Sequence, residues 1–469
     1  MGALERIDHD KRVVCGGMGV DISGWKLAGE VARLGGVGTI SATGQGDVLA
    51  RRLTQLRRDP DNHELQLVKD SLETFPNPSM VDRVLDKYHE HVSSEDTGER
   101  RYRPTQQPRI GALEAEMLQV LGTYVQADLA KRRAGGRGLV AVNTLGKIPR
   151  MVAPSAIGAI LAGADVFVQG AGVPDQVPQL LTDLTVTGGG RYRMDVAGLP
   201  DVYQEYSMER YNLDGVPVAR PEAWGIVSRT DVAKRLAQVG IEALVIESAQ
   251  AGGHNAPTSG PEAPLAEYLE FGLPCIVAGG VAQKGLSAIQ AEGGEAIQIG
   301  SLFALSNESG MDPMLRARTL RGIINQKQPL QVRQDEHISP TGFPFQVAEV
   351  AGTVSQAEVL QERSRVCDLA FLTQGYKKKD GSIGYRCPAE PIEQFERKIA
   401  SPILARNIGE RACLCNNLFA AAGLAQRRGE YEEPALVTLG STVEADVMAV
   451  ARAYKLPITA AKVFEFVRR

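Results

Sequence analysis

The sequence predicts an α/β protein built on a (β/α)8 barrel, the TIM-barrel architecture. Short β-branched runs alternate with helical stretches, and Gly-rich turns often follow the runs. This pattern is typical of parallel strands joined by crossover helices. The length of 469 residues suits one barrel of the usual size, about 250 residues, with roughly 200 residues of insertion and tail.

Eight runs in chain order are the candidate barrel strands. We expect them at residues 13–15, 38–42, 139–143, 166–169, 226–228, 243–247, 275–278 and 296–299. Ser23 should cap a first helix over 24–34, and Gly35-Gly36 should end it. Further helices are expected at 113–133, 153–162 and 231–239, where apolar residues recur at helical spacing.

Two longer segments interrupt the alternation of strands and helices. A polar stretch over about 44–110, after strand two, reads as an insertion with helices at 47–57 and 80–91 and a loop around 93–107. A hairpin-like excursion is expected at 185–218. The predicted domains are therefore a barrel over 1–335, with that insertion, and a mostly helical C-terminal extension over 336–469 packed on the barrel.

Composition and charge exclude several classes of protein. A net charge of −4 and a pI near 6.0 give no basic field for nucleic acid or an anionic membrane. The charged N-terminus lacks the apolar core of a secretion signal, and the apolar runs are too interrupted to span a bilayer. Six cysteines are too few for a disulfide framework in 469 residues. We therefore expect a cytoplasmic protein.

Glycine-rich loops follow the last two predicted strands. They are Ala278-Gly279-Gly280 and Gln298-Ile299-Gly300-Ser301. Glycines let backbone N–H groups approach an anion closely, and these two loop positions commonly hold a phosphate in barrels. The alternative is that the glycines only make tight turns. Their occurrence in both loops favours a phosphate site.

The loop after the sixth predicted strand carries the candidate catalytic residue. Of six histidines, only His254 follows a predicted strand at the end where barrels place their active sites, on the turn Gly252-Gly253. An imidazole can accept a proton from carbon or oxygen near neutral pH. A histidine that only hydrogen-bonds to the loop backbone is the alternative.

These motifs together resemble the nitronate monooxygenases, also called 2-nitropropane dioxygenases. The resemblance rests on the order and spacing of Gly16-Gly17-Met18-Gly19, Ala251-Gly252-Gly253-His254 and the two phosphate loops. The stretch 251–257 and the tail segments 385–391 and 413–416 are similar to a longer-chain subgroup of that family.

The resemblance implies non-covalently bound FMN at the top of the barrel. The phosphate would lie on Gly279, Gly280, Gly300 and Ser301, and the ring system against the loop of Gly17, Met18 and Gly19. Asn143 matches an Asn that the family places beside the flavin, whereas Glu247 stands where a Gln is usual. The other expected lining residues are Gln169, Gly252, Gly253, Ala278, Gln298 and Ile299, with Lys147 just beyond strand three.

The activity implied is oxidation of alkyl nitronates or nitroalkanes by O2 to carbonyl compounds and nitrite. His254 would remove the α-proton of a nitroalkane, or hold the nitronate through a protonated ring. One alternative is an NAD(P)H-dependent FMN enoyl-thioester or quinone reductase, for instance in a biosynthetic pathway. The other is a non-catalytic protein that binds flavin or a partner.

No metal is expected. Cys367, Cys387, Cys413 and Cys415 lie in the tail, but their spacing lacks the paired pattern of zinc knuckles, which favours packing. The expected partners are a small-molecule substrate and O2, and a homodimer is expected by analogy.

Overall fold

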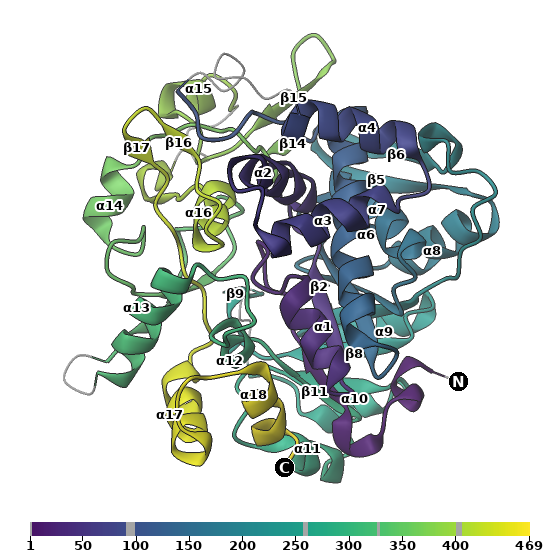
Figure 1. Cartoon of the computed structure of the whole chain (residues 1–469), viewed down its shortest axis with the longest axis vertical. Coiled ribbons are helices and arrows are strands. Elements are labelled where there is room, and N and C mark those ends of the chain that lie inside the picture. Colours follow the sequence, from purple (N-terminus) through teal and green to yellow (C-terminus); the bar gives the residue numbers. More distant parts are fainter. Residues whose placement is uncertain (1, 91–98, 257–260, 326–328, 400–405) are drawn as a thin grey trace.

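Eight parallel strands close into a barrel, which confirms the predicted fold class (Figure 1). The computed structural model describes residues 2–90, 99–256, 261–325, 329–399 and 406–469. Each strand pairs with the next along the ring, and β11 closes it by pairing with β1. The strands, in ring order, are β1 (Val13–Cys15), β2 (Val37–Ser41), β3 (Leu139–Leu145), β4 (Val166–Gly170), β7 (Glu222–Val227), β8 (Ala243–Glu247), β10 (Cys275–Ala278) and β11 (Ala296–Ile299).

The predicted strand bounds hold for β1, β8, β10 and β11, and the other four strands differ at their ends. The largest difference is at β7, which begins at Glu222 rather than at residue 226. The sequence did not predict this start because the first residue of the strand, Glu222, is charged. The Glu222 carboxylate accepts hydrogen bonds from the Ala3 backbone N–H and from Trp224 Nε1. The N-terminal 3-10 helix η1 (Ala3–Arg6) is thereby tied to the barrel strand.

Alternate residues of the strands fill the barrel interior. One buried cluster contains Val14, Ala141, Val168, Val245 and their counterparts on other strands, together with Ala3 and Leu4 of η1 and the fully buried Trp224. Their neighbours in sequence pack outward against the helices. Because side chains alternate across a strand, this assignment fixes which later residues face the same way.

Helices surround the ring. They are α1 (Trp25–Arg33), α6 (Leu113–Ala134), α7 (Pro149–Leu161), α8 (Val177–Val186), α9 (Thr230–Gln238), α10 (Leu265–Leu269), α11 (Gly285–Ala291), α12 (Ser301–Ala304) and α13 (Pro313–Ile324). The prediction that Ser23 caps α1 is wrong, since the N-cap residue is Gly24. Ser23 Oγ instead accepts a hydrogen bond of 2.8 Å from the Met18 N–H and so fixes the first loop. Among the described helices, none has the length and apolarity to cross a lipid bilayer.

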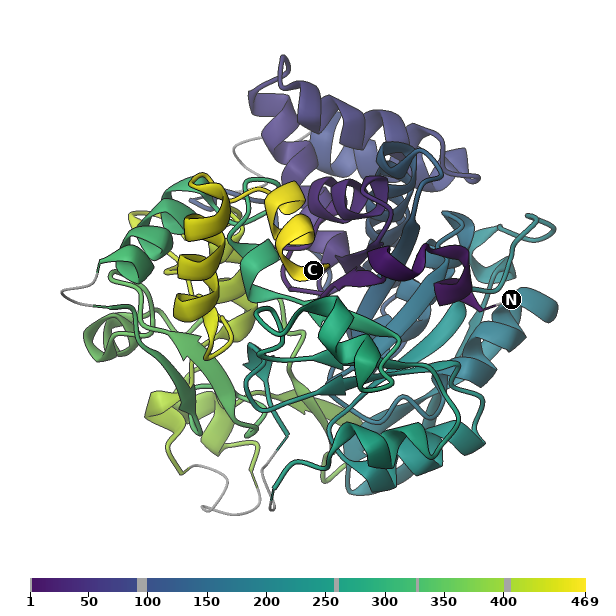
Figure 2. The same cartoon turned by 90° about the horizontal axis from the view of Figure 1, so that it is seen from below.

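The insertion is helical, as predicted, and contains one helix that the sequence did not reveal. It comprises α2 (Gln45–Arg58), α3 (His63–Glu73), α4 (Pro78–Leu85) and the π-helical η3 (Asp86–Glu90). The unpredicted helix is α3, which packs with α2 against α6. Figure 2 shows the insertion as a separate layer above the barrel. The predicted helix end at residue 91 and the loop residues 93–98 lie outside the described residues.

The predicted excursion at 185–218 contains a hairpin, β5 (Gly189–Ala197) and β6 (Leu199–Ser207). Strand β14 (Gln374–Lys377) of the tail adds to β5 in parallel, and β15 (Ile383–Arg386) adds to β14. The tail therefore extends a sheet that begins in the barrel part of the chain.

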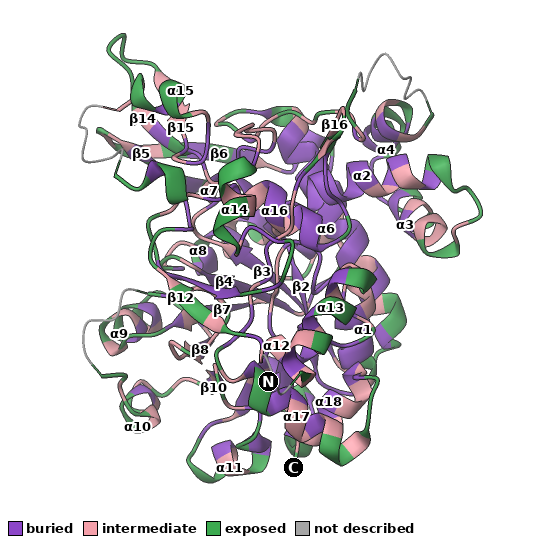
Figure 3. Cartoon of the chain, turned by 90° about the vertical axis from the view of Figure 1, so that its left-hand side faces the viewer, coloured by how far each residue is buried: buried purple, intermediate pink, exposed green. Residues whose placement is uncertain are grey.

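The C-terminal extension contains helices, as predicted, and short strands as well. The helices are α14 (Ala357–Glu362), α15 (Ile392–Glu396), the 3-10 helix η6 (Ile408–Glu410), α16 (Leu414–Ala421), α17 (Val443–Tyr454) and α18 (Ala460–Val467). The remaining strands are β12 (Val332–Asp335), β13 (Phe345–Ala348), β16 (Arg427–Arg428) and β17 (Tyr431–Glu432). Helix α18 packs on α1 and α11, and much of α16 is buried (Figure 3). The boundary at residue 335 stays a prediction, and β12 and β13 pair across it.

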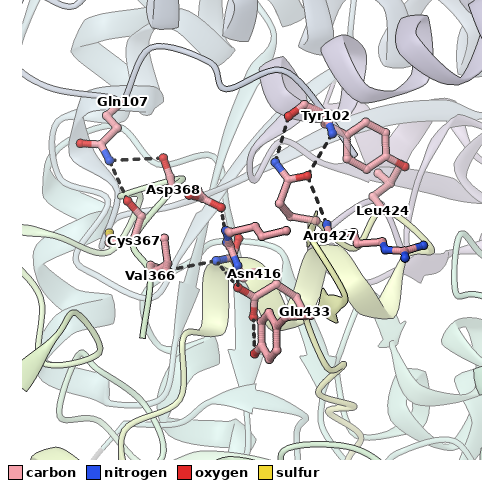
Figure 4. A network of polar contacts seen from close by, with 12 residues as sticks. Tyr102, Gln107, Val366, Cys367, Asp368, Asn416, Leu424, Arg427 and Glu433 are labelled. Carbon is pink, nitrogen blue, oxygen red and sulfur yellow. Dashed lines mark hydrogen bonds and ion pairs between the residues drawn. The ribbon is translucent and has the colours of Figure 1, made fainter. Parts of the chain in front are cut away.

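Buried polar contacts join the insertion to the tail (Figure 4). The Tyr102 N–H donates to Gln426 Oε1, and Gln426 Nε2 donates back to the Tyr102 carbonyl, each over 3.0 Å. Gln107 Nε2 also donates to the Cys367 carbonyl over 2.9 Å. Because buried polar groups are costly when unpaired, these contacts fix the two added segments against each other.

We expect Phe464→Ala to destabilise the whole protein, because Phe464 is 1% exposed among residues of α1, α11 and α17. Truncating a buried phenylalanine costs about 3–5 kcal/mol. Met314→Ala, at a position 74% exposed on α13, is the control and should change little. The measurement is urea unfolding followed by fluorescence and circular dichroism. A separate early transition in Phe464→Ala would mean that the tail folds independently of the barrel.

Candidate active site

A large cavity opens at the C-terminal ends of the barrel strands, and the tail covers it. The loops after β1, β3, β8, β10 and β11 line one side, and residues of α16 and of the segment 436–442 line the other. The predicted site residues that line it are Gly17, Met18, Gly19, Asn143, Glu247, Gly252, Gly253, His254, Ala278, Gly279, Gly280, Gln298, Ile299, Gly300 and Ser301.

Strand alternation explains which polar residues face this cavity. Ala141, Val245 and Ala296 belong to the interior cluster of the barrel. The residues two positions later are Asn143, Glu247 and Gln298, and they point to the same side at the barrel mouth.

Two of the expected lining residues, Lys147 and Gln169, are not among the residues that line the cavity. Gln169 lies on β4. It follows the inward-facing Val168 by one position, so the strand directs it outward. There it is buried, and its Oε1 accepts a hydrogen bond of 2.9 Å from the Tyr192 hydroxyl.

The two glycine loops form a concave surface of backbone amides. Gly279 has φ +84°, and a Cβ there would lie 2.4 Å from Ser248 Oγ, so a larger residue would be both strained and crowded. Within the described part of the chain, no acceptor is bonded to the N–H groups of Gly279, Gly280 or Gly300. Ser301 Oγ accepts the Gly440 N–H at 2.7 Å and keeps its own proton to donate. These donors fit the phosphate that the resemblance implies.

The first loop packs closely beside Asn143. A Cβ on Gly17 would lie 2.4 Å from the Asn143 Cβ, so the loop backbone packs directly on that side chain. Met18 and Gly19 continue the cavity wall. This arrangement fits a planar ring system, as the resemblance implies.

His254 is held by a loop of the tail. It lies in β9 (Gly253–His254), which pairs antiparallel with β13 so that His254 faces Phe345. The two rings meet edge to face, with centroids 4.8 Å apart, and the imidazole Nε2 lies 2.7 Å from Ser339 Oγ. Burial, and then the nearby charge of Lys147, lowers the pKa of His254 to about 3. The ring is therefore neutral at pH 7, which disfavours the protonated-ring role expected from the sequence.

Lys147 supplies a positive charge beside this histidine. It lies between Leu145 and Ile148, which both line the cavity, and burial lowers its pKa to about 8. Its Nζ lies 3.6 Å from the centre of the Phe343 ring. No carboxylate of the described residues pairs with it. A partly buried cation without an anionic partner is costly, so the site is suited to an anion.

Glu247 is the acidic group of the cavity. Burial raises its pKa to about 7, and no basic residue offsets that effect. The carboxyl group has no hydrogen-bond partner within the described residues. A glutamate in this state changes charge near neutral pH, which a glutamine cannot do.

Sequence reasoning missed the part of the site that the tail supplies. Ser339 and Phe345 contact His254, and Leu414, Leu436 and Gly440 line the cavity. The stretch Gly440-Ser441-Thr442 before α17 has the same small-residue character as the barrel loops and was an available signal. The apolar residues gave no signal, because apolar helix residues usually pack in a core.

The four tail cysteines meet around a second, much smaller cavity. It is lined by Cys367, Cys387, Cys413 and Cys415. Burial raises the pKa of each of these thiols, to about 12 for Cys367. Among the described residues, no group of three or more His, Cys, Asp or Glu side chains is arranged to hold a metal ion.

A family match covers the central part of the site. The sequence model of the family described as nitronate monooxygenase matches residues 222–327. This segment includes β7 through α13, and therefore His254 and both glycine loops. No curated protein matches the chain.

Several solved structures are similar over nearly the whole chain. FabK from Thermotoga maritima is 14% identical, with 99% of this chain and 93% of that chain covered and a TM-score of 0.49. A nitroalkane oxidase from Streptomyces ansochromogenes is 16% identical, with 97% and 94% covered and a TM-score of 0.43. The enoyl reductase domain of MlnA from Bacillus amyloliquefaciens is 10% identical, with 97% and 92% covered and a TM-score of 0.47.

The barrel, the loops at its mouth and the family match together define an oxidoreductase. The matched segment, which holds the histidine and both glycine loops, is similar to the nitronate monooxygenase family, in agreement with the resemblance seen in the motifs.

We expect Glu247→Gln to change how stability depends on pH. The pKa of Glu247 is raised from 4.5 to about 7, so between those values the folded protein keeps a proton that the unfolded chain loses. The wild type should therefore lose stability relative to Glu247→Gln as pH rises from about 4.5 to 7, and no further above that. The expected difference is on the order of 1–3 kcal/mol. Denaturant unfolding across this pH range measures it. Parallel curves for the two proteins would contradict a neutral Glu247.

Proposed function

We propose that this protein uses FMN to oxidise alkyl nitronates or nitroalkanes to carbonyl compounds and nitrite, with O2 as the final oxidant. The observation that carries the proposal is the unpaired cation Lys147, which lies close to the neutral His254 and between the lining residues Leu145 and Ile148. A nitronate is an anion, and its two oxygens can accept a charged and a neutral hydrogen bond.

Lys147 and His254 would have separate roles in the reaction. Lys147 would attract the nitronate by its charge, and with a pKa of about 8 it is mostly charged at pH 7. His254 would accept the α-proton of a neutral nitroalkane, and the nitronate anion formed beside the ring would raise its low pKa as the proton is transferred. If its Nε2–H donates to Ser339 Oγ, 2.7 Å away, Nδ1 carries the free lone pair for that step. Phe345 packs against the ring and limits its rotation.

The glycine loops would hold the cofactor. The amides of Gly279, Gly280 and Gly300 and the hydroxyl of Ser301 fit a phosphate, and the Gly17 loop with Asn143 fits the ring system. When bound, the flavin supplies the electron acceptor, and the chain supplies orientation, charge and exclusion of water.

A second candidate is reduction of an enoyl thioester or quinone with NAD(P)H. The observation that favours it is the apolar wall that the tail adds, with Leu372, Leu414, Leu418 and Leu436 at the cavity. Such a wall suits a substrate with an aliphatic chain. The cytoplasmic location and the homodimer stay predictions.

Anaerobic flavin bleaching separates the two candidates. We expect the purified protein to be yellow and to be bleached rapidly by a propyl nitronate but slowly by NADH and NADPH. Lys147→Met should lose about tenfold or more of the nitronate rate at low substrate, because charge-assisted hydrogen bonds contribute about 1.5–3 kcal/mol. Lys147→Arg, which keeps the charge, is the control. Bleaching by a reduced nicotinamide alone would favour the reductase.

We expect His254→Asn to slow oxidation of a neutral nitroalkane by about 100-fold or more, in the range typical of general-base catalysis. Oxidation of the preformed nitronate should fall much less, because that substrate has already lost its proton. Steady-state rates with both forms of one substrate make the comparison. Equal losses would show that His254 is not the base.

A further inference from the structure

The tail segment 438–442 lies between two loops of the site. Its first residue, Thr438, makes two hydrogen bonds through one hydroxyl. Thr438 Oγ1 accepts the Gly253 N–H over 2.6 Å and donates to the Gln346 carbonyl over 2.7 Å. Gly253 directly precedes His254, and Gln346 lies opposite Gly253 in the β9–β13 pair. One hydroxyl thus links both strands that carry the histidine.

The other end of the segment contacts the phosphate loop. The Gly440 N–H donates to Ser301 Oγ over 2.7 Å, and the Ser441 N–H donates to the Gln250 carbonyl over 3.0 Å. The fit is close, because a Cβ on Gly440 would lie 2.6 Å from the Gln250 oxygen. The segment therefore touches the loop after β8 and the loop after β11, which are separated in the ring by β10.

The backbone beside His254 is held on its other side by Asn255, whose N–H donates to the Pro344 carbonyl over 3.0 Å. Strand β9 has only two residues, and Gly253 has φ +89°, so short pairing and a flexible residue precede the imidazole. Within the described residues, the only side chain bonded to the Gly253 N–H is that of Thr438. Gly440 likewise fixes the direction of the Ser301 hydroxyl, because its N–H donates to Ser301 Oγ.

We propose that the segment 438–442 is a bridge that positions the site. Thr438 sets the place of His254 through Gly253, and Gly440 directs the Ser301 hydroxyl towards the phosphate site. The catalytic part of this inference rests on the proposed function. The barrel would then be incomplete without its C-terminal extension, because the extension aligns the proton acceptor with the cofactor loops.

The test compares Thr438→Val with Thr438→Ser in the full-length, flavin-loaded protein. Valine keeps the shape but lacks the hydroxyl, whereas serine keeps it. Hydrogen exchange of the peptide 249–256, measured by mass spectrometry, should be about fivefold faster in Thr438→Val, as expected for one lost net hydrogen bond. It should be restored in Thr438→Ser. The FMN content should stay unchanged in both variants.

Activity gives a second readout for the same pair. Thr438→Val should lower kcat for the neutral nitroalkane several-fold more than for the preformed nitronate, as a displaced base would. Unchanged exchange in Thr438→Val, or equally fast exchange in Thr438→Ser, would overturn the bridge. Because the exchange measurement needs no substrate, an altered exchange with no nitronate oxidation in the wild type would overturn the proposed function and leave the bridge standing.

The opposite end is tested by Gly440→Ala. Its Cβ would press on the Gln250 carbonyl and move the amide from Ser301, so FMN should dissociate at least tenfold more readily, as measured by fluorescence recovery on dilution. Gly409→Ala, where a Cβ meets nothing within 4 Å, is the control in the same tail. Thermal melting of the apoprotein identifies any general loss of folding. A Gly440→Ala protein that folds and retains FMN as the wild type does would contradict the bridge.

Discussion

Closure of eight parallel strands into one ring is the constraint on which the site depends. A closed ring brings every strand end to the same rim, and the pleat decides which side chains point into it. Asn143, Glu247 and Gln298 meet at the mouth because each lies two residues beyond a packed interior residue. By the same rule Gln169 points away from the cavity, because it lies one residue after the inward-facing Val168. The chemistry of the cavity is thus set first by backbone geometry and only then by residue type.

Burial controls the charges in this cavity. The tail excludes water from the barrel mouth, and removal of water disfavours every ionised group there. His254 becomes neutral, Glu247 holds its proton towards neutral pH and Lys147 loses part of its basicity. These three changes act in one direction, since each lowers the amount of uncompensated charge in the cavity. A bound anion would pair with Lys147 and so raise the pKa of its ammonium group again.

The sequence predicted the barrel and most of the barrel side of the site, because both follow from local rules. Glycine loops and the histidine turn can be recognised wherever they follow a strand, as at Gly279 and His254. The missed features depend on contacts between distant segments. The start of β7 at Glu222 was not predicted because the partner of its carboxylate, the Ala3 N–H, lies more than 200 residues earlier in the chain. Ser339 and Thr438 look like ordinary loop residues until the fold places them beside His254 and Gly253.

The extension and the insertion have one structural role in common, which explains why both are present. A bare barrel mouth is open to water, whereas this cavity has a wall from α16 and the segment 436–442. That wall needs its own support, and the insertion provides it through Tyr102, Gln107 and the buried Arg51, which donates to the Leu424 carbonyl. The insertion thus holds the tail, and the tail encloses the site. A change in the polar contacts between these segments would therefore reach the cavity without altering any residue that lines it.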